Sequence, residues 1–169
     1  QWLLALAQLR EMRQQHLVLD DVSYSAAISA CEKGGQWLLA LAQLREMRQQ
    51  RVSPNVISYN AAISACEKGG QWLLALAQLR EMRQQQVVPD DISYCAAISA
   101  CEKGGQWLLA LAQLREMRQQ HISPNVISYN AAISACEKGG QWLLALAQLR
   151  EMRQQQVVPD DISYCAAIS

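Results

Sequence analysis

The sequence lacks a net charge, a long apolar run and a recognisable targeting segment. Its 15 Lys and Arg balance 15 Asp and Glu over 169 residues, so no strong overall field draws in nucleic acid or a membrane surface. The longest apolar run, WLLALA, is far shorter than the roughly 20 residues that cross a bilayer. No signal or transit peptide is recognisable. We therefore expect no membrane insertion, and we do not expect a polyanion binder that relies on charge alone.

The sequence also lacks the side-chain groupings on which catalysis depends. No nucleophile–base pair, paired acidic constellation, phosphate-binding glycine loop or metal-binding cluster recurs in it. The two histidines, His16 and His121, occupy a position at which the other copies of the same motif carry Arg or Gln, so neither is expected to be catalytic. The prediction is a protein that is not an enzyme and that needs neither a metal nor a cofactor.

What the chain does contain is a repeat. The motif QWLLALAQLREMRQQ starts at residues 1, 36, 71, 106 and 141, which is a period of 35 residues. Such a period indicates stacked structural units rather than one globular domain. The predicted organisation is one continuous solenoid with a partial repeat at 1–20, full repeats at 21–55, 56–90, 91–125 and 126–160, and a partial repeat at 161–169.

Each repeat reads as two helices. The first, VISYNAAISACEK in the second full repeat, follows Asn55, a good N-cap residue, and stops at a Gly-Gly pair that suits a helix end. The second, QWLLALAQLREMRQQ, carries Trp, Ala, Leu, Leu and Met at helical spacing, which predicts a packing face. Because the tryptophans lie on this face, we interpret them as core residues rather than base-stacking platforms.

Helical phase divides the first helix into two faces. Tyr59, Ala62, Ile63 and Cys66 recur at i, i+3, i+4 and i+7 and form the predicted core stripe. A second stripe beside it is mixed in character and consists of Ile57, Asn60, Ser64 and Lys68. On the second helix, Leu73, Leu74 and Ala77 lie outside the packing stripe, so neighbouring repeats are expected to stack on them. The mixed stripe would then form a ladder along the inner wall of an α-solenoid.

The six cysteines do not suggest disulfides. Stacked helices lie roughly 10 Å apart, whereas a disulfide needs Cα atoms within about 7 Å. No Cys-x-x-Cys motif or Cys/His cluster points to a metal. The sequence therefore predicts reduced, buried thiols and a reducing compartment. Four share one repeat position, Cys31, Cys66, Cys101 and Cys136, and two share another, Cys95 and Cys165.

The repeat resembles a known family. The 35-residue period and the unit VISYNAAISACEKGGQWLLALAQLREMRQQRVSPN resemble the pentatricopeptide repeat. The matching features are Tyr-Asn-x-x-Ile at the start, Lys-x-Gly before the second helix, Ala-Leu-x-x-Leu-x-x-Met within it, and Pro-Asp or Pro-Asn at the close. The resemblance covers essentially the whole chain. It implies an all-α, right-handed α-solenoid superhelix of helix-turn-helix repeats that binds single-stranded RNA, one base per repeat, in a mitochondrion or plastid.

The resemblance also implies which residues read bases. In that family the residue after Ser-Tyr and the residue that closes the repeat choose the base together. The resulting pairs are Ser25 with Asn55, Asn60 with Asp90, Cys95 with Asn125, and Asn130 with Asp160. The Asn–Asp pairs imply uracil and the Ser–Asn pair implies adenine. The Cys–Asn pair departs from the usual ones, since a thiol is a weak donor, and adenine is assigned to it. The implied site is A-U-A-U.

Two further sets of residues follow from the resemblance. The family's base-clamping aliphatic position corresponds to Val22, Ile57, Ile92, Ile127 and Ile162. Its phosphate-contacting position corresponds to Lys33, Lys68, Lys103 and Lys138. The mixed stripe had already grouped Ile57, Asn60 and Lys68 by helical phase alone. One departure concerns the loop after the second helix, where His16, Arg51 and Gln86 stand in place of the family's usual glycine.

A second interpretation remains open. Block 36–105 recurs from residue 106 onward with only Arg51 and Val52 replaced, by His121 and Ile122. Duplication of such a block copies any residue pairing, whether or not it is used. The closing Asn and Asp residues also suit plain helix caps. The alternative is a non-catalytic scaffold segment that contacts protein subunits or RNA shape in a larger assembly, or a designed, consensus-like array.

Overall fold

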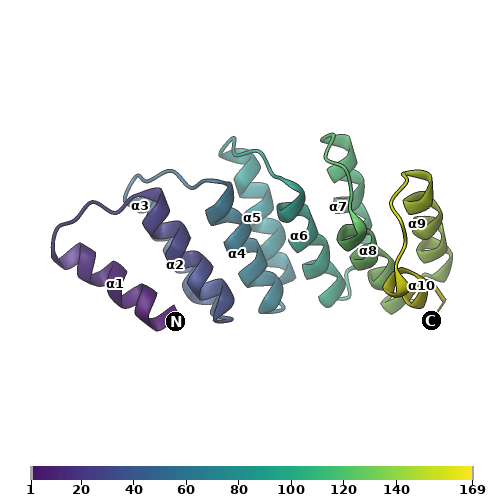
Figure 1. Cartoon of the computed structure of the whole chain (residues 1–169), viewed down its shortest axis with the longest axis horizontal. Coiled ribbons are helices and arrows are strands. Elements are labelled where there is room, and N and C mark those ends of the chain that lie inside the picture. Colours follow the sequence, from purple (N-terminus) through teal and green to yellow (C-terminus); the bar gives the residue numbers. More distant parts are fainter. Residues whose placement is uncertain (1, 169) are drawn as a thin grey trace. The chain divides into compact units, whose positions relative to one another are not determined.

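The computed structural model describes residues 2–168, which fold into α-helices joined by short loops (Figure 1). No strand occurs in this range. The first helices of the repeats are α2 (Asp21–Lys33), α4 (Val56–Lys68), α6 (Asp91–Lys103), α8 (Val126–Lys138) and α10 (Asp161–Ile168). The second helices are α1 (Trp2–Gln14), α3 (Trp37–Gln49), α5 (Trp72–Gln84), α7 (Trp107–Gln119) and α9 (Trp142–Gln154). The prediction of an all-α fold built from 35-residue helical hairpins is confirmed.

The helices gather into two compact units. The first comprises Gln1–Pro89, with α1 to α5, and the second comprises Asp90–Ser169, with α6 to α10. In the first unit, α2 packs against α3 of its own repeat and against α4 of the next, and α3 also contacts α4. In the second unit, α6, α7 and α8 repeat this arrangement. Within each unit, stacking of this kind is that of an α-solenoid.

The first helices α2, α4, α6 and α8 start and stop where the sequence indicates. At α4, the Asn55 side chain accepts a hydrogen bond from the Ser58 backbone N–H at 3.0 Å, and the Ser58 hydroxyl bonds back to the Asn55 backbone. This reciprocal capping box satisfies donors that a helix start leaves free. At the other end, the Gly69 N–H donates to the Ala65 carbonyl at 3.0 Å, and Gly70 follows with a φ of 68°.

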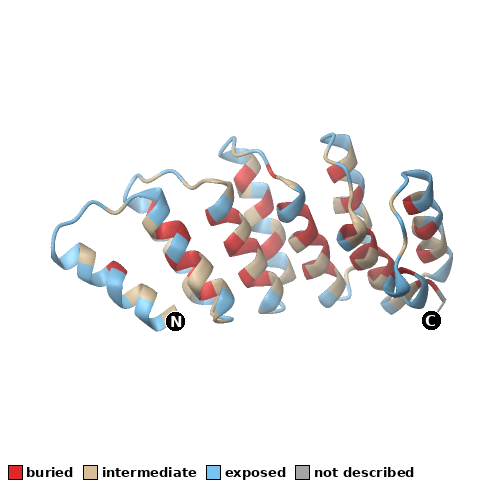
Figure 2. Ribbon diagram, in the orientation of Figure 1, coloured by how far each residue is buried: buried red, intermediate tan, exposed pale blue. Residues whose placement is uncertain are grey.

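The core lies along the first helices. The predicted stripe Tyr59, Ala62, Ile63 and Cys66 is fully buried, and Figure 2 shows buried residues concentrated on this helix, α4. Ala61 and Ala65, on other sides of α4, are buried as well. Small residues at these positions let successive first helices approach closely. The first helix is thus the element that is covered on more than one face.

The second helix is covered on one side only, which corrects one expectation. Leu73 is 63% exposed, Ala77 is exposed and Leu74 is half-buried. The prediction that neighbours would stack on Leu73 and Ala77 is wrong. The physical reason is that α5 packs against α4 with the side carrying Ala75 and Leu79, both fully buried. None of the helices over residues 2–168 has the length and apolar character to cross a bilayer.

Three tryptophans, Trp2, Trp37 and Trp107, pack against the next repeat and are not fully buried in the core. The Trp37 ring of α3 lies against Gly69 at the end of α4, so a Cβ atom added at Gly69 would be 2.4 Å from Trp37 Cδ1. Trp2 meets Gly34 in the same way, and Trp107 meets Gly139. These three rings are half-buried, whereas Trp142 is 62% exposed. The interpretation of the tryptophans as core is therefore only partly right.

The loop after each second helix keeps a backbone conformation typical of glycine, although the residue there is not glycine. His16, Arg51, Gln86, His121 and Gln156 all have positive φ, between 55° and 60°. This left-handed conformation is the one that glycine adopts at no steric cost. The fold therefore keeps the turn and accepts the strain of a larger side chain there.

Gly69 and Gly70 should resist substitution for different reasons. We expect Gly69→Ala to destabilise the protein by about 1–3 kcal/mol, because the methyl group overlaps the Trp37 ring. Gly70→Ala should cost about 1–2 kcal/mol through its left-handed backbone, since no atom lies within 4 Å of the added Cβ. Urea unfolding of each variant, alone and combined with Trp37→Ala, measures this. The Trp37→Ala background should remove the Gly69→Ala penalty and leave that of Gly70→Ala; equal penalties in both backgrounds would contradict the interlock.

The five buried thiols should react only slowly in the native protein. Burial raises the pKa of Cys66, Cys95, Cys101 and Cys136 to about 11 and also raises the pKa of Cys31. Cys165, by contrast, is exposed. Because the thiolate is the nucleophile, a disulfide reagent at about pH 8, close to the ordinary thiol pKa, should label Cys165 rapidly and the buried cysteines slowly. In guanidinium chloride all six should react, and rapid native labelling of several thiols would contradict the burial.

Candidate nucleic-acid interface

The predicted base-reading residues meet at the starts of the first helices. Three of the four predicted pairs lie within a unit, and in each the two side chains make a hydrogen bond although they are 30 residues apart in sequence. The contacts are Ser25 with Asn55, Cys95 with Asn125, and Asn130 with Asp160. Asn60 belongs to the first unit and Asp90 to the second, and both are half-buried.

Asn55 shows how one closing residue is held. Its Oδ1 accepts from the Ser58 backbone N–H at 3.0 Å and from Ser25 Oγ at 3.4 Å. Its Nδ2 donates to Asp21 Oδ2 at 2.9 Å. The same side chain therefore caps α4, contacts the predicted reader on α2, and binds an acid at the start of α2.

The Cys95–Asn125 pair repeats this geometry with a thiol in place of the hydroxyl. Cys95 Sγ lies 3.4 Å from Asn125 Oδ1, and Asn125 Oδ1 accepts the capping bond from the Ser128 N–H at 3.0 Å. Asn125 Nδ2 lies 3.5 Å from Asp91 Oδ2. Cys95 is only 9% exposed, and burial raises its pKa to about 11. At neutral pH the residue is therefore a protonated, weak donor.

In the Asn130–Asp160 pair the closing residue is a carboxylate and the reader is the amide. Asn130 Nδ2 donates to both carboxylate oxygens of Asp160, at 2.9 and 3.1 Å. Asp160 also caps α10 by accepting from the Ser163 N–H at 2.9 Å. The backbone N–H of Ser163 and the amide of Asn130 together lower the pKa of Asp160 from its ordinary value. This pair presents a carboxylate where the other two present an amide.

The predicted clamping residues are exposed in every repeat. Val22, Ile57, Ile92, Ile127 and Ile162 have exposed fractions of 67, 63, 57, 63 and 63%. Each follows the first residue of its helix, and the first four precede a predicted reader by three positions, so they lie on the same face as that reader. An exposed aliphatic residue beside a polar pair suits contact with the flat face of a base.

The predicted phosphate-contacting lysines are exposed, and ion pairs with glutamates hold Lys68 and Lys138. Lys68 pairs with Glu32 of the preceding repeat, and Lys138 pairs with Glu102. Ser64 and Ser134 donate to the same carboxylates, at 3.2 and 3.3 Å. Sequence reasoning missed these glutamates and the acids Asp21 and Asp91. Helical phase groups Ser64 with Lys68, but Glu32 lies 36 residues before Lys68, so no local sequence pattern connects it to them.

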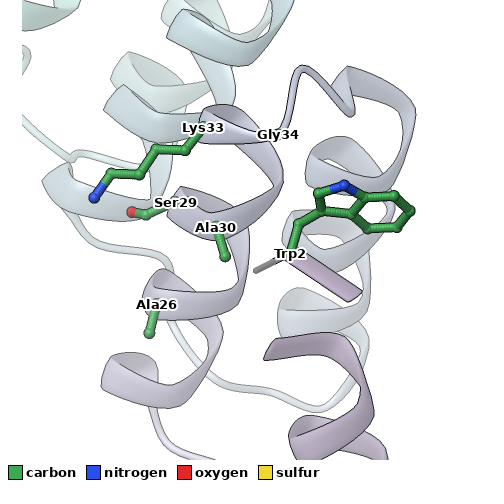
Figure 3. Close-up of a pocket in the computed structure, with 6 residues that line it drawn as sticks. All are labelled: Trp2, Ala26, Ser29, Ala30, Lys33 and Gly34. Carbon is green, nitrogen blue, oxygen red and sulfur yellow. The ribbon is translucent and has the colours of Figure 1, made fainter. Parts of the chain in front are cut away.

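A pocket of about 500 Å³ is lined by residues of α2, by Gly34 at its end and by Trp2 (Figure 3). Figure 3 shows Ser29 and Lys33 extending on one side of α2, while Trp2 lies beside Gly34. The corresponding residues of α4, Ser64 and Lys68, face α2 and bind its Glu32. The pocket therefore belongs to the surface by which repeats pack on one another, and we assign it no ligand. The described part of the chain contains no group of three or more His, Cys, Asp or Glu that could hold a metal ion.

The sequence profile of the pentatricopeptide repeat domain matches residues 8–68 and 78–141, more than half of the chain. This chain belongs to the pentatricopeptide repeat family. Two further profiles of the family, the PPR repeat family and the PPR repeat, match residues 124–169 and 57–87. Among curated proteins, none matches the chain in sequence.

Solved structures of this family resemble the chain. The pentatricopeptide repeat protein PPR10 in complex with an 18-nt psaJ RNA element is 30% identical, with a TM-score of 0.79, over 89% of this chain and 22% of PPR10. PPR10 from maize is 28% identical, with a TM-score of 0.71, over 96% and 23%. The PPR domain of Arabidopsis thaliana protein-only RNase P 1, in complex with tRNA, is 21% identical, with a TM-score of 0.75, over 83% and 74%, a likeness that shows the fold alone. The chain thus spans about a fifth of PPR10, 22% in the first comparison.

Asp160 should make stability depend on pH at the acid end. Its pKa is lowered in the folded state from the ordinary 3.8, so its contribution is fully present above pH 3.8 and is lost as the pH falls through the folded pKa. Asp160→Asn keeps a cap of the kind seen at Asn125 but removes this titration. Urea unfolding between about pH 2 and 6 should therefore show a shallower loss of stability with acid in the variant.

A matched control is Asp161→Asn, which also removes one carboxylate from the start of α10. Asp161 lies one residue beyond the cap and does not provide the capping bond to Ser163. If Asp161→Asn flattened the acid limb as much as Asp160→Asn, general charge and not the cap contact would be responsible.

Proposed function

We propose that this chain binds single-stranded RNA, one base per repeat, with the preference A-U-A-U along its four residue pairs. The observation that carries the proposal is that, in the three pairs that lie within one unit, the reader and the closing residue meet beside an exposed aliphatic side chain. Ser25 with Asn55 presents an amide, which suits the ring-nitrogen acceptors of adenine. Asn130 with Asp160 presents a carboxylate, which suits the N3–H of uracil. Only side chains that meet in space can read one base edge together.

The family relationship supports the same proposal. PPR10, at 30% identity, has been solved in complex with an 18-nt RNA, and pentatricopeptide repeats are recognised by the features found in this chain. A role in the RNA metabolism of a mitochondrion or plastid is proposed on the family relationship alone. No catalysis is proposed for these repeats.

The lysine contacts set an upper limit on the electrostatic part of binding. Four phosphate contacts, from Lys33, Lys68, Lys103 and Lys138, give a salt slope of about −3 for a single strand. Each of these lysines that stays paired with a glutamate reduces the magnitude of the slope by about 0.7. Binding of a four-base site by this segment should therefore be weak and only modestly sensitive to salt.

A scaffold role is the second candidate, and a specific observation favours it. The ion pairs of Lys68 with Glu32 and of Lys138 with Glu102 join consecutive repeats, which is a structural use of the lysines. The formal net charge of zero also gives the chain no general attraction to RNA. In this reading the same surface contacts protein subunits of a larger assembly.

Exchange of one pair should change the base that is preferred. The triple variant Val126→Asp, Asn130→Ser and Asp160→Asn copies the native Asp21, Ser25 and Asn55 into the fourth site and retains the helix cap. We expect the wild-type chain to prefer A-U-A-U over A-U-A-A, and the variant to reverse this order. Each preference should be on the order of tenfold, since a well-formed base contact discriminates by about 1–3 kcal/mol. Fluorescence anisotropy with labelled oligonucleotides flanked by cytidines measures both affinities.

The outcomes separate the two candidates. Equal affinity of the wild-type chain for A-U-A-U and for oligocytidine would exclude base reading. No binding at low salt would leave only the scaffold role. A variant that binds RNA as the wild type does, with no change in preference, would show that the Asn130–Asp160 contact does not select the base.

A further inference from the structure

In each full repeat, either the first residue or the last residue is an aspartate, but never both. Its first helical residue and its closing residue are Asp21 with Asn55, Val56 with Asp90, Asp91 with Asn125, and Val126 with Asp160. Where the closing residue is Asn, the first residue is Asp, and where the closing residue is Asp, the first residue is Val. The positions are 34 residues apart in sequence, so helical phase cannot relate them.

The structure gives this alternation a physical cause. Asp21 Oδ2 accepts from Asn55 Nδ2 at 2.9 Å, and Asp91 Oδ2 lies 3.5 Å from Asn125 Nδ2. On its other side each amide must present oxygen, because Oδ1 accepts the capping N–H of Ser58 or Ser128, in both cases at 3.0 Å. An amide that is held by an acceptor on one side and a donor on the other cannot exchange its oxygen and nitrogen.

In the repeats that start with valine, the closing residue is itself the aspartate. In the repeat that starts at Val126, the closing Asp160 carries the negative charge and receives the Asn130 amide. An aspartate at position 126 would place a second carboxylate near the first, and like charges at short range disfavour ionisation of both. Valine avoids that repulsion. The first helical residue is therefore matched to the chemistry of the closing residue.

We infer that Asp21 and Asp91 are positioning residues that fix the amides of Asn55 and Asn125 and thereby set the base preference of those two repeats. The inference rests on the proposed function. With the amide fixed, Nδ2 keeps one hydrogen for a base acceptor such as an adenine ring nitrogen, while Oδ1 stays turned to the helix cap. If the amide could turn, Oδ1 would accept from the N3–H of uracil, and adenine and uracil would be separated less well.

The first test needs no RNA. In the isotopically labelled chain, Asp21→Val should speed exchange of the Asn55 side-chain amide protons with water by about three- to tenfold, as expected for loss of one hydrogen bond. Asp21→Asn, which retains an acceptor oxygen, should restore most of the protection. Asp161→Val is the matched control, since it removes the equivalent acid of α10 and lies far from Asn55 in sequence. Unchanged exchange in Asp21→Val would overturn the inference.

The second test uses RNA that differs only at the first base. We expect the wild-type chain and Asp161→Val to prefer A-U-A-U over U-U-A-U. In Asp21→Val the ratio of the two affinities should be about three- to tenfold smaller, while the circular dichroism spectrum stays unchanged. Asp91→Val should do the same at the third base, and Asp21→Asn should recover the first-base preference. Full retention of the preference in Asp21→Val would overturn the role in selectivity. If the wild-type chain bound no RNA, the proposed function would fail, and the exchange measurement would still decide whether Asp21 positions the amide.

Discussion

The hydrogen bond between the closing residue of one repeat and the backbone at the start of the next first helix is the contact on which the rest depends. The side-chain oxygen of the last residue of one repeat caps the first helix of the next repeat. Asn55 Oδ1 caps α4 and, at the same time, receives the hydroxyl of Ser25 from α2. Helix initiation, contact between repeats and assembly of the candidate reading pair are therefore one event. A closing residue that could not cap would remove the pair as well as the helix start.

The first helices and the second helices of the repeats are buried to different extents. The first helices are small-residue helices buried on more than one side, with Ala61, Ala62 and Ala65 all covered. The second helices are buried on one side and are joined to one another by ion pairs such as Arg13 with Glu46 and Arg118 with Glu151. Half-exposed ion pairs contribute little to stability individually, roughly 0–1 kcal/mol. The burial of the first helices must therefore supply most of the stabilisation, and the candidate surface lies on these buried helices.

The sequence predicted what depends on local pattern. The caps, the Gly-Gly helix ends and the core stripe of Tyr59, Ala62, Ile63 and Cys66 follow from residue type and helical phase, and all were found. The exposure of Leu73 was not predicted, because the phase of a helix shows which residues share a face and not which faces meet a neighbour. The partners of Lys68 and Asn55 escaped for a related reason. Glu32 and Asp21 lie 36 and 34 residues away, and only the stacking distance brings them near.

The interlock between Trp37 and Gly69 has a consequence for how such a chain can grow. At Gly34, Gly69 and Gly139 the indole of one repeat occupies the volume that a side chain would take at the end of the next first helix, so each of these junctions needs a large side chain on one side and a glycine on the other. A segment that is inserted in whole multiples of 35 residues brings both halves with it, and any other length leaves one half unmatched. The packing at the junction is therefore compatible only with the insertion of complete repeats. The copying of block 36–105 in the sequence is a lengthening that leaves every such junction matched.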